Sequence, residues 1–323
     1  MLKFGEIILS KRSLFRASSH PAPLRSLIAA VAVTILGAGA LTACSTNSST
    51  SSPSGSSDLS SETAVSEVSD KNTPVAADVT VTEATNISAA ADPDGSTVID
   101  LHGMLYRVPA GGGTATQLSE AEHEVARPDV GPDGKVVYQS YDGGDFDIWV
   151  AEADGSNPEK ITDGIADYRE PRWSPDGEHI AFSSDREKGS YDIWSIEVAT
   201  GEFTRWTDSE DDESQPSWSP TGEEIVFINQ NSIAAVNREG TIRPLGEDPG
   251  EDILVHAPSM SPDGQSVVWI EHDGDVSNLI LNGTALTEGE DVFPFTPEWT
   301  GDQTFRYTAD GKIWDRDLAA NRG

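Results

Sequence analysis

The stretch "EPRWSPDGEHIAFSSD", residues 170–185, combines a tight turn with a short apolar strand. Pro175 fixes its φ near −65°, which suits the second position of a turn, and Asp176 and Gly177 complete the reversal. The run "HIAF" that follows is apolar and rich in residues that favour strands. We therefore interpret Asp176 and Gly177 as structural residues of a turn rather than as part of a metal site.

The same pattern recurs along the chain. It is repeated as "ADPDGSTVID" (91–100), "VGPDGKVVYQS" (130–140), "WSPDGEHIAFSS" (173–184), "WSPTGEEIVFIN" (218–229), "MSPDGQSVVWIE" (260–271) and "WTGDQTFRYT" (299–308). Equivalent positions follow one another at intervals of 39 to 45 residues. A period near 40 residues that contains several short strands is typical of the blades of a β-propeller.

Each repeat predicts a four-stranded antiparallel sheet. The first strand of each repeat precedes the turn, as in "PRWS" (171–174), and the second follows it. A third run, such as "DIWSIEVATG" (192–201), and a short fourth run, such as "FTRWT" (203–207), complete the repeat. One such sheet has two apolar faces, and stacking the sheets in a ring covers both of them. We therefore predict an all-β fold, a six-bladed propeller, and we expect its recurring tryptophans to pack between blades: Trp149, Trp173, Trp194, Trp218, Trp269, Trp299 and Trp314.

The sixth repeat ends before it could form a fourth strand. The segment Val79–Thr82, "VTVT", precedes the first repeat and has the alternation of a strand. We expect this N-terminal strand to complete the last blade by pairing with the strand around Ile313–Arg316.

The repeated frame P-x-W-S-P-D-G-x-x-I-A-F-x-S, followed by D-I-W, resembles the TolB-type propeller repeat, most closely at 127–162 and 171–207. The resemblance covers about three quarters of the chain. It implies a six-bladed propeller of the bacterial envelope that works by binding proteins. Two features differ from that family: a serine-rich segment stands where TolB proteins have a small α/β domain, and the chain carries signs of a lipid anchor.

The N-terminal region predicts export and lipidation. Basic residues precede the apolar run "LIAAVAVTILGAGAL" (27–41), which is shorter than the 20 or so residues of a membrane-spanning helix. The run ends in "LTAC", which resembles a bacterial lipobox, so we expect Cys44, the chain's single cysteine, to be lipidated. The export route, general or twin-arginine, stays open.

Three segments follow from these features: a lipoprotein signal peptide (1–43), a disordered tether rich in Ser, Thr and Pro (44–77), and the propeller (78–323). The tether lacks the apolar residues that a core requires. The expected location is the extracytoplasmic face of the cell membrane, through the lipid anchor, and we expect a monomer.

The net charge of the chain limits the classes of partner that it can bind. The chain has 55 acidic against 21 basic residues, a net charge of −34, which would repel nucleic acid. In a propeller, the links from each outer strand to the next inner strand gather on one face around the channel. The five predicted links hold 18 acidic residues among 54, and the basic residues among them are Arg127 and Arg169.

We therefore predict an acidic mouth that binds a basic segment of an envelope protein, or a divalent cation. The residues that we assign to it are Asp208, Glu210, Asp211, Asp212, Glu213, Glu251, Asp252, Glu288, Glu290 and Asp291. Because no spaced calcium-loop pattern is present, we assign no cofactor, although calcium binding stays open. Solvated loops on an acidic protein are the alternative, and Tyr168, Phe293 and Phe295 fit either contact with a partner or packing of the loops.

The sequence favours a binding protein over an enzyme. It has no G-x-S-x-G motif, and its histidines show no metal-binding spacing. A calcium-dependent hydrolase of the lactonase or phosphoesterase type, with its site in the propeller channel, is the alternative function.

Overall fold

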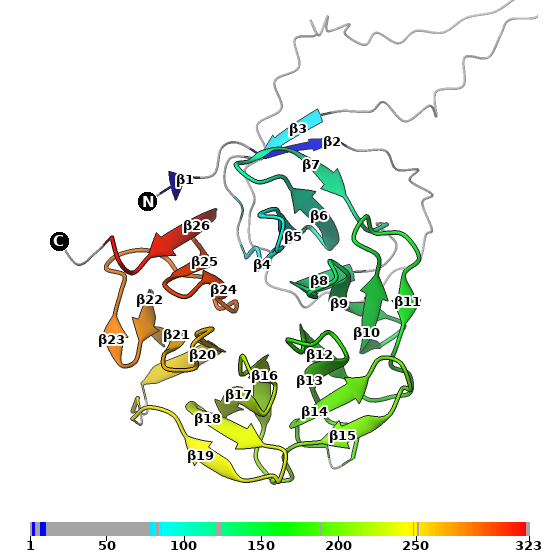
Figure 1. Cartoon of the computed structure of the whole chain (residues 1–323), viewed down its shortest axis with the longest axis vertical. Helices are drawn as coiled ribbons and strands as arrows, with labels where there is room; N and C mark the ends of the chain where they lie inside the picture. Colours follow the sequence, from blue (N-terminus) through cyan, green and yellow to red (C-terminus); the bar gives the residue numbers. More distant parts are fainter. Residues whose placement is uncertain are drawn as a thin grey trace, which may run out of the picture.

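The computed structural model describes residues 2–3, 7–10, 78–81, 84, 86–120, 124–187, 189–247, 249–250 and 252–320. These residues form six sheets arranged in chain order around a central axis (Figure 1), and their strands pair antiparallel except at one outer edge, where residues 7–9 pair in parallel with residues 113–115. The six-bladed propeller predicted from the repeats is therefore confirmed. Among the described residues, no helix has the length and apolar character needed to cross a membrane.

Within each blade, the first strand lies nearest the axis and the last lies outermost. Blade 1 contains β4 (Ala89–Ala91), β5 (Thr97–Leu101), β6 (Met104–Val108) and β7 (Gly113–Gln117). Blade 2 contains β8 (Glu124–Val130), β9 (Val136–Asp142), β10 (Asp145–Ala151) and β11 (Glu159–Lys160). Blade 3 contains β12 (Tyr168–Trp173), β13 (His179–Ser184), β14 (Asp192–Glu197) and β15 (Phe203–Arg205).

The second half of the ring repeats this plan. Blade 4 contains β16 (Glu213–Trp218), β17 (Glu224–Asn229), β18 (Ser232–Asn237) and β19 (Ile242–Pro244). Blade 5 contains β20 (Ile253–Met260), β21 (Val267–Asp273), β22 (Val276–Leu281) and β23 (Thr284–Ala285). Blade 6 contains β24 (Glu298–Gly301), β25 (Thr304–Ala309) and β26 (Lys312–Asp317), with β1 (Leu2–Lys3) on its outer edge.

The ring closes differently from the prediction. The strand β26 pairs with β1, through Leu2 opposite Asp315, and not with the described part of the predicted segment, Val79–Val81. That segment forms β3 (Asp78–Val81), which pairs with β2 (Ile7–Ser10) at the outer edge of blade 1. The chain after β3 reaches blade 6 through the hydrogen bond from the backbone N–H of Ala84 to the carbonyl of Gly311. It therefore passes the β25–β26 hairpin instead of running along the edge of β26.

The apolar core lies between the blades, as six clusters that each join two neighbours. Phe182, Phe227 and Phe305 on the second strands are fully buried, and burial of each contributes about 1.5–3 kcal/mol relative to exposure. Trp218 of blade 4 packs edge-to-face on Trp206 of blade 3, with ring centroids 5.4 Å apart. The expected packing of tryptophans between blades is thus found.

The turn residues act as the sequence predicts. The carboxylate of Asp176 accepts hydrogen bonds from the backbone N–H of Glu178 at 3.0 Å and from the Ser174 hydroxyl at 2.5 Å. Gly177 has a φ of +73°, which glycine adopts without strain. Asp94, Asp133 and Asp263 accept the same local backbone bond in their own turns. We call the face that carries these turns the turn face.

Candidate binding site at the channel mouth

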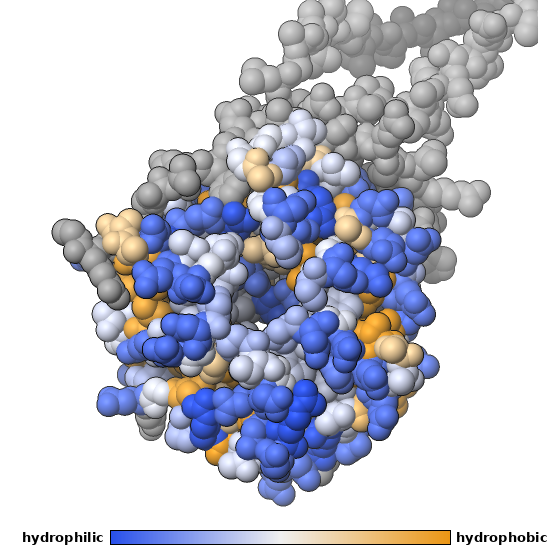
Figure 2. Space-filling model, in the orientation of Figure 1, coloured by the Kyte–Doolittle hydropathy of each residue, from blue (hydrophilic) through white to orange (hydrophobic). Residues whose placement is uncertain are grey.

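The opposite face carries the links between blades, and we call it the link face. Each blade runs as an antiparallel meander, so the hairpins between its second and third strands also end on the link face. Both sets of loops therefore surround the same end of the channel. Figure 2 shows one face of the ring with a hollow at its centre, bordered mainly by hydrophilic residues.

A bulge shapes the inner strand of blades 2 to 5 near the link face. The register shifts in β8, β12, β16 and β20, and in each the residue before a proline has a positive φ. These residues are Arg127, Glu170, Gln215 and Ala257, with φ between 53° and 61°. A positive φ is unfavourable for residues other than glycine, so it needs support from the surroundings.

That support is a belt of hydrogen bonds from blade to blade. The backbone N–H of Glu170 donates to the Gln139 side chain at 2.8 Å, and the N–H of Gln215 donates to the Glu170 carboxylate at 2.6 Å. The N–H of Ala257 donates in turn to the Gln215 side chain at 2.5 Å. In every case the acceptor belongs to the preceding blade, so the belt fixes both the bulges and the alignment of the blades.

The belt begins at a buried carboxylate in blade 1. Asp100 accepts the backbone N–H of Ser88 at 2.7 Å and that of Arg127 at 3.0 Å. Burial raises the pKa of Asp100, and these hydrogen bonds oppose the rise. Asp100 therefore joins the first two inner strands.

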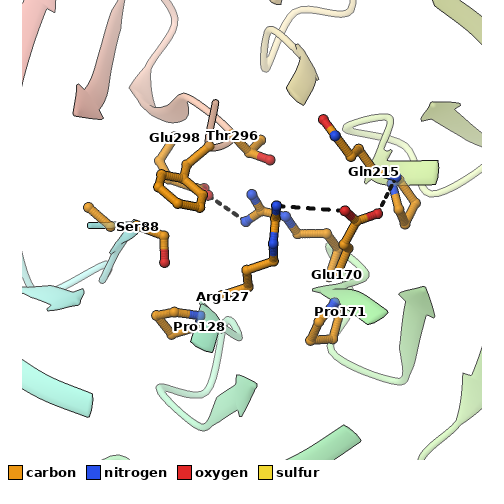
Figure 3. A pocket seen from close by; sticks show the side chains of 12 residues that line it. Ser88, Arg127, Pro128, Glu170, Pro171, Gln215, Thr296 and Glu298 are labelled. Carbon is orange, nitrogen blue, oxygen red and sulfur yellow. Dashed lines mark hydrogen bonds and ion pairs between the residues drawn. The ribbon is translucent and has the colours of Figure 1, made fainter. Parts of the chain in front are cut away.

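The middle of the channel holds two arginine side chains. Arg127 lies 3.7 Å from the Glu170 carboxylate and 5.2 Å from the centre of the Phe295 ring. Figure 3 shows Arg127 and Glu170 pointing toward one another, with Gln215 beyond them. Arg172 lies deeper and pairs with Asp129 of blade 2 at 3.2 Å and with Glu298 of blade 6 at 2.5 Å. The space enclosed by these side chains is about 20 Å³, enough for one water.

Most of the predicted acidic mouth is exposed on the link face. Asp208, Glu210, Asp211 and Asp212 lie on the link between β15 and β16, and Asp252, Glu288 and Asp291 are exposed on later links. Asp208 pairs with Arg205 at 2.9 Å, and Asp212 accepts the backbone N–H of Tyr191. Whether these residues bind a partner stays a prediction.

Three of the predicted residues differ from the rest. Glu213 is fully buried and accepts the Ser209 hydroxyl at 3.1 Å, and burial raises its pKa, so its carboxylate is not open to a partner. Glu290 is half-buried and accepts the Tyr307 hydroxyl at 2.7 Å. Glu251 lies outside the described residues, as does Cys44.

The aromatic residues of the links pack inward. Tyr168 and Phe295 are buried, and the partly buried Phe293 packs against the cluster between blades 6 and 1. Packing of the loops is therefore the reading that the structure supports. Arg169 stacks 4.5 Å from the centre of the Phe146 ring and pairs with Asp167, so it does not reach the channel.

Two features of the link face escaped sequence reasoning. The hairpins between second and third strands add acidic residues to it, among them Asp273, Asp275 and Asp310, all exposed. The sequence could have placed these hairpins on the link face, because alternate connections of an antiparallel meander end on the same face. Among the residues with a described exposure, five large apolar side chains are exposed, and the link face carries four of them: Tyr141, Ile165, Leu254 and Val276, with exposed fractions of 42%, 94%, 51% and 47%.

These apolar residues lie on opposite sides of the ring. Tyr141 belongs to β9 of blade 2, and Ile165 lies on the link from blade 2 to blade 3. Leu254 and Val276 lie at one end of blade 5, where β20 and β22 flank β21. Blades 2 and 5 face one another across a six-bladed ring. The link face therefore has apolar side chains on two sides, with exposed carboxylates between them.

Comparison with known proteins identifies the repeat. The family described as the TolB beta propeller domain matches residues 111–288. A Tol-Pal system protein TolB of Methylobacillus flagellatus is 31% identical over 96 residues, which cover 27% of this chain and 21% of that protein. An uncharacterised protein of Agrobacterium fabrum is 35% identical over 81 residues, 25% of this chain and 28% of that protein. The match thus spans about a quarter of each relative's length.

Solved structures share the fold. A structure assigned as TolB from Agrobacterium tumefaciens aligns with a TM-score of 0.57 and 20% identity, over 74% of this chain and 92% of that one. TolB from Acinetobacter baumannii aligns with a TM-score of 0.57 and 18% identity, over 72% and 61%. A gluconolactonase from Xanthomonas campestris aligns with a TM-score of 0.52 and 15% identity, over 72% and 86%. At these identities the likeness establishes the fold alone.

Proposed function

The chain belongs to the TolB beta-propeller domain family, and on that premise we propose that it is a lipid-anchored protein of the bacterial cell envelope whose link face binds a basic segment of another protein. Membership of the family establishes that the chain contains a TolB-like propeller module. The protein partner and the anchor at Cys44 are the proposed parts.

The observation that carries the binding proposal is the composition of the link face. Exposed carboxylates from the links and hairpins surround the mouth, and isolated apolar side chains stand among them on blades 2 and 5. Carboxylates at a concave rim attract cations and steer basic partners, whereas apolar side chains contribute most when a partner removes them from water. The partner that fits both features is a segment with lysine or arginine next to large apolar residues.

The channel centre supports a partner that stays at the mouth. The Arg172–Glu298 ion pair crosses the channel from blade 3 to blade 6, and the space on its link side holds about one water. A peptide would therefore contact the carboxylates of the rim rather than thread through the ring.

The hydrolase alternative has weaker support. Asp129 and Glu298, the carboxylates deepest in the channel, both pair with Arg172, so a calcium ion between them would have to displace a guanidinium group. Among the described residues, the one group of three His, Cys, Asp or Glu ligand atoms within 4.8 Å of one another is Asp176, Glu178 and His179, on the turn face. A panel of lactones and phosphoesters with calcium is the direct test of turnover.

The binding proposal is tested with a peptide of alternating lysine and leucine. The variant Asp211→Asn, Asp212→Asn, Glu288→Gln and Asp291→Asn removes four exposed charges from the link face, and we expect it to weaken binding about tenfold at low salt. The matched control removes four exposed charges from the turn face: Glu178→Gln, Glu202→Gln, Glu223→Gln and Glu239→Gln.

An equal loss of peptide affinity in the two variants would show a general effect of charge and would contradict the assignment of the binding site to the link face. If a lysine–serine peptide bound as tightly as the lysine–leucine peptide, the exposed apolar side chains of the link face would not contribute to binding. For the anchor, Cys44→Ala should abolish incorporation of a labelled fatty acid in cells and release the protein from membranes.

A further inference from the structure

A second, larger cavity opens at the other end of the channel, on the turn face. It has a volume of about 380 Å³, within the range of small-molecule sites, and we call it the vestibule. Its lining comes from blades 2 to 6. From the sequence, no residues are assigned to a site at this end of the channel.

The wall of the vestibule is aromatic and rigid. The tryptophan that precedes Ser-Pro or Thr-Gly in three repeats lines it, as Trp173, Trp218 and Trp299, and four turn prolines form its rim. Trp218 is fixed by a hydrogen bond from its indole N–H to the backbone carbonyl of Arg172 at 3.0 Å. Trp173 and Trp218 are 8% and 7% exposed, so each presents a small apolar area to the cavity against which an apolar chain can pack.

The floor of the vestibule is charged. Asp129, Arg172 and Glu298 meet there, and their side chains keep 12%, 15% and 19% of their exposure. Besides its pair with Arg172, Asp129 accepts the backbone N–H of Trp173 at 2.7 Å. The floor is thus almost dry but can still be reached from the cavity.

The charges of the floor do not balance when both carboxylates are ionised. Two carboxylates share one guanidinium, which leaves a surplus of one negative charge. The neighbouring cations are already paired: Arg306 with Asp315 at 2.8 Å, and Arg127 with Glu170 at 3.7 Å. Burial is the main cause that raises the pKa of Glu298 to about 7, and Asp129 adds to the rise, whereas Arg172 and, more weakly, Arg306 oppose it.

We infer that the vestibule binds an alkylammonium group, whose positive charge sits at the Asp129–Arg172–Glu298 floor and whose apolar chain packs against Trp173, Trp218 and Trp299. Such a ligand supplies the one charge that the floor lacks and keeps the Arg172 ion pairs in place. The source of the group is either a small amine or a lysine side chain of a peptide. The inference is independent of the proposed function because it concerns the opposite face.

Calorimetry at pH 8 tests this site on the full-length protein, because there Glu298 is ionised and a primary amine is protonated. The probes are hexylammonium, hexanol, calcium chloride, and the peptides Gly-Gly-Lys-Gly-Gly and Gly-Gly-Ala-Gly-Gly. We expect hexylammonium to bind at least tenfold more tightly than hexanol. Either the lysine peptide binds as hexylammonium does, which assigns a peptide source, or hexylammonium binds alone, which assigns a small amine.

The variant Glu298→Gln keeps the shape of the floor and removes its surplus charge, so we expect it to weaken hexylammonium binding at least tenfold. Glu239→Gln, which removes an exposed charge on the turn face outside the lining of the vestibule, is the control and should leave binding unchanged. Quenching or a shift of tryptophan fluorescence on binding reports contact with the vestibule wall, and it should disappear with Glu298→Gln.

Four outcomes would overturn the inference: hexanol binding as tightly as hexylammonium, calcium binding in place of the amine, Glu298→Gln binding as wild type does, or no binding to the wild-type protein. The hexanol comparison uses the wild-type protein alone, so the test remains decisive even if a variant fails to fold.

Discussion

The two faces of the ring use aspartate and glutamate in different ways. On the turn face, Asp94, Asp133, Asp176 and Asp263 each accept a backbone N–H of their own turn. On the link face, Asp211, Glu288 and Asp291 are exposed, and no described hydrogen bond uses their carboxylates as acceptors. The four turn-face carboxylates therefore hold the backbone, whereas these three on the link face are free to meet a partner.

The channel, where the two faces meet, should give the largest effect on stability. Because the pKa of Glu298 is raised to about 7, the folded protein holds this proton more tightly than the unfolded chain does. The contribution of Glu298 to the free energy of unfolding is therefore fully present below about pH 4.5 and is lost as the pH rises to about 7. We expect wild type to lose up to about 3 kcal/mol from this group over that range.

The measurement is denaturant unfolding of wild type and Glu298→Gln between pH 4.5 and 8. The difference in unfolding free energy between them should change with pH in favour of the variant as the pH rises. A difference that stays constant across the range would contradict the buried surplus charge and would also weaken the inference about the vestibule.

The turn face should show the next largest effect. Gly177 has a φ of +73°, and a Cβ atom added there would lie 2.9 Å from Cγ of Pro132 in the neighbouring blade. We expect Gly177→Ala to lower the free energy of unfolding by about 2–3 kcal/mol, because backbone strain and a clash between blades add together. Thermal unfolding followed by circular dichroism measures the loss.

Gly201→Ala is the matched control. Gly201 has the same φ of +73°, but nothing lies within 4 Å of an added Cβ. Its loss should be nearer 1 kcal/mol, from strain alone. If the two variants lost the same stability, the close contact between the turns of neighbouring blades would contribute nothing.

The smallest effects are expected when one carboxylate on each face is replaced by alanine. Asp176→Ala removes two hydrogen bonds that hold the turn, and we expect it to cost about 1–2 kcal/mol without changing the affinity for the lysine–leucine peptide. Asp211→Ala should change stability by less than about 0.5 kcal/mol and weaken peptide binding. The opposite assignment of effects would contradict the division of labour between the faces.

Local repeats made the fold predictable, and long-range contacts limited the prediction of the site. The Pro-Asp-Gly turns and the runs after them interact within a few residues, so blade number, strand order and the role of Asp176 could be read from the sequence. The belt from Asp100 to Ala257 and the Arg172–Glu298 pair join residues of different blades, which no local pattern reveals. Glu213 looked like its acidic neighbours, but it begins the inner strand β16 and is buried there.

The closure of the ring shows the same limit. Alternation in Val79–Thr82 correctly indicated a strand, whereas its partner depended on which free edge the chain reached. Both β1 and β2 belong to the segment that we assign to the signal peptide. If that segment is removed, the outer edge of β26 loses its partner, and Asp78–Val81 loses its own.

The prolines of the inner strands determine how a partner can use the centre of the ring. Pro128, Pro171, Pro216 and Pro258 lie within β8, β12, β16 and β20, each at the inner edge of its blade. Proline has no N–H to donate, and edge strands that contain it resist pairing with another strand. An incoming peptide therefore cannot bind at the centre by extending a sheet, and its recognition there must come from side chains. The same prolines disfavour pairing of the inner edges with strands of another copy of the protein, and they therefore oppose aggregation.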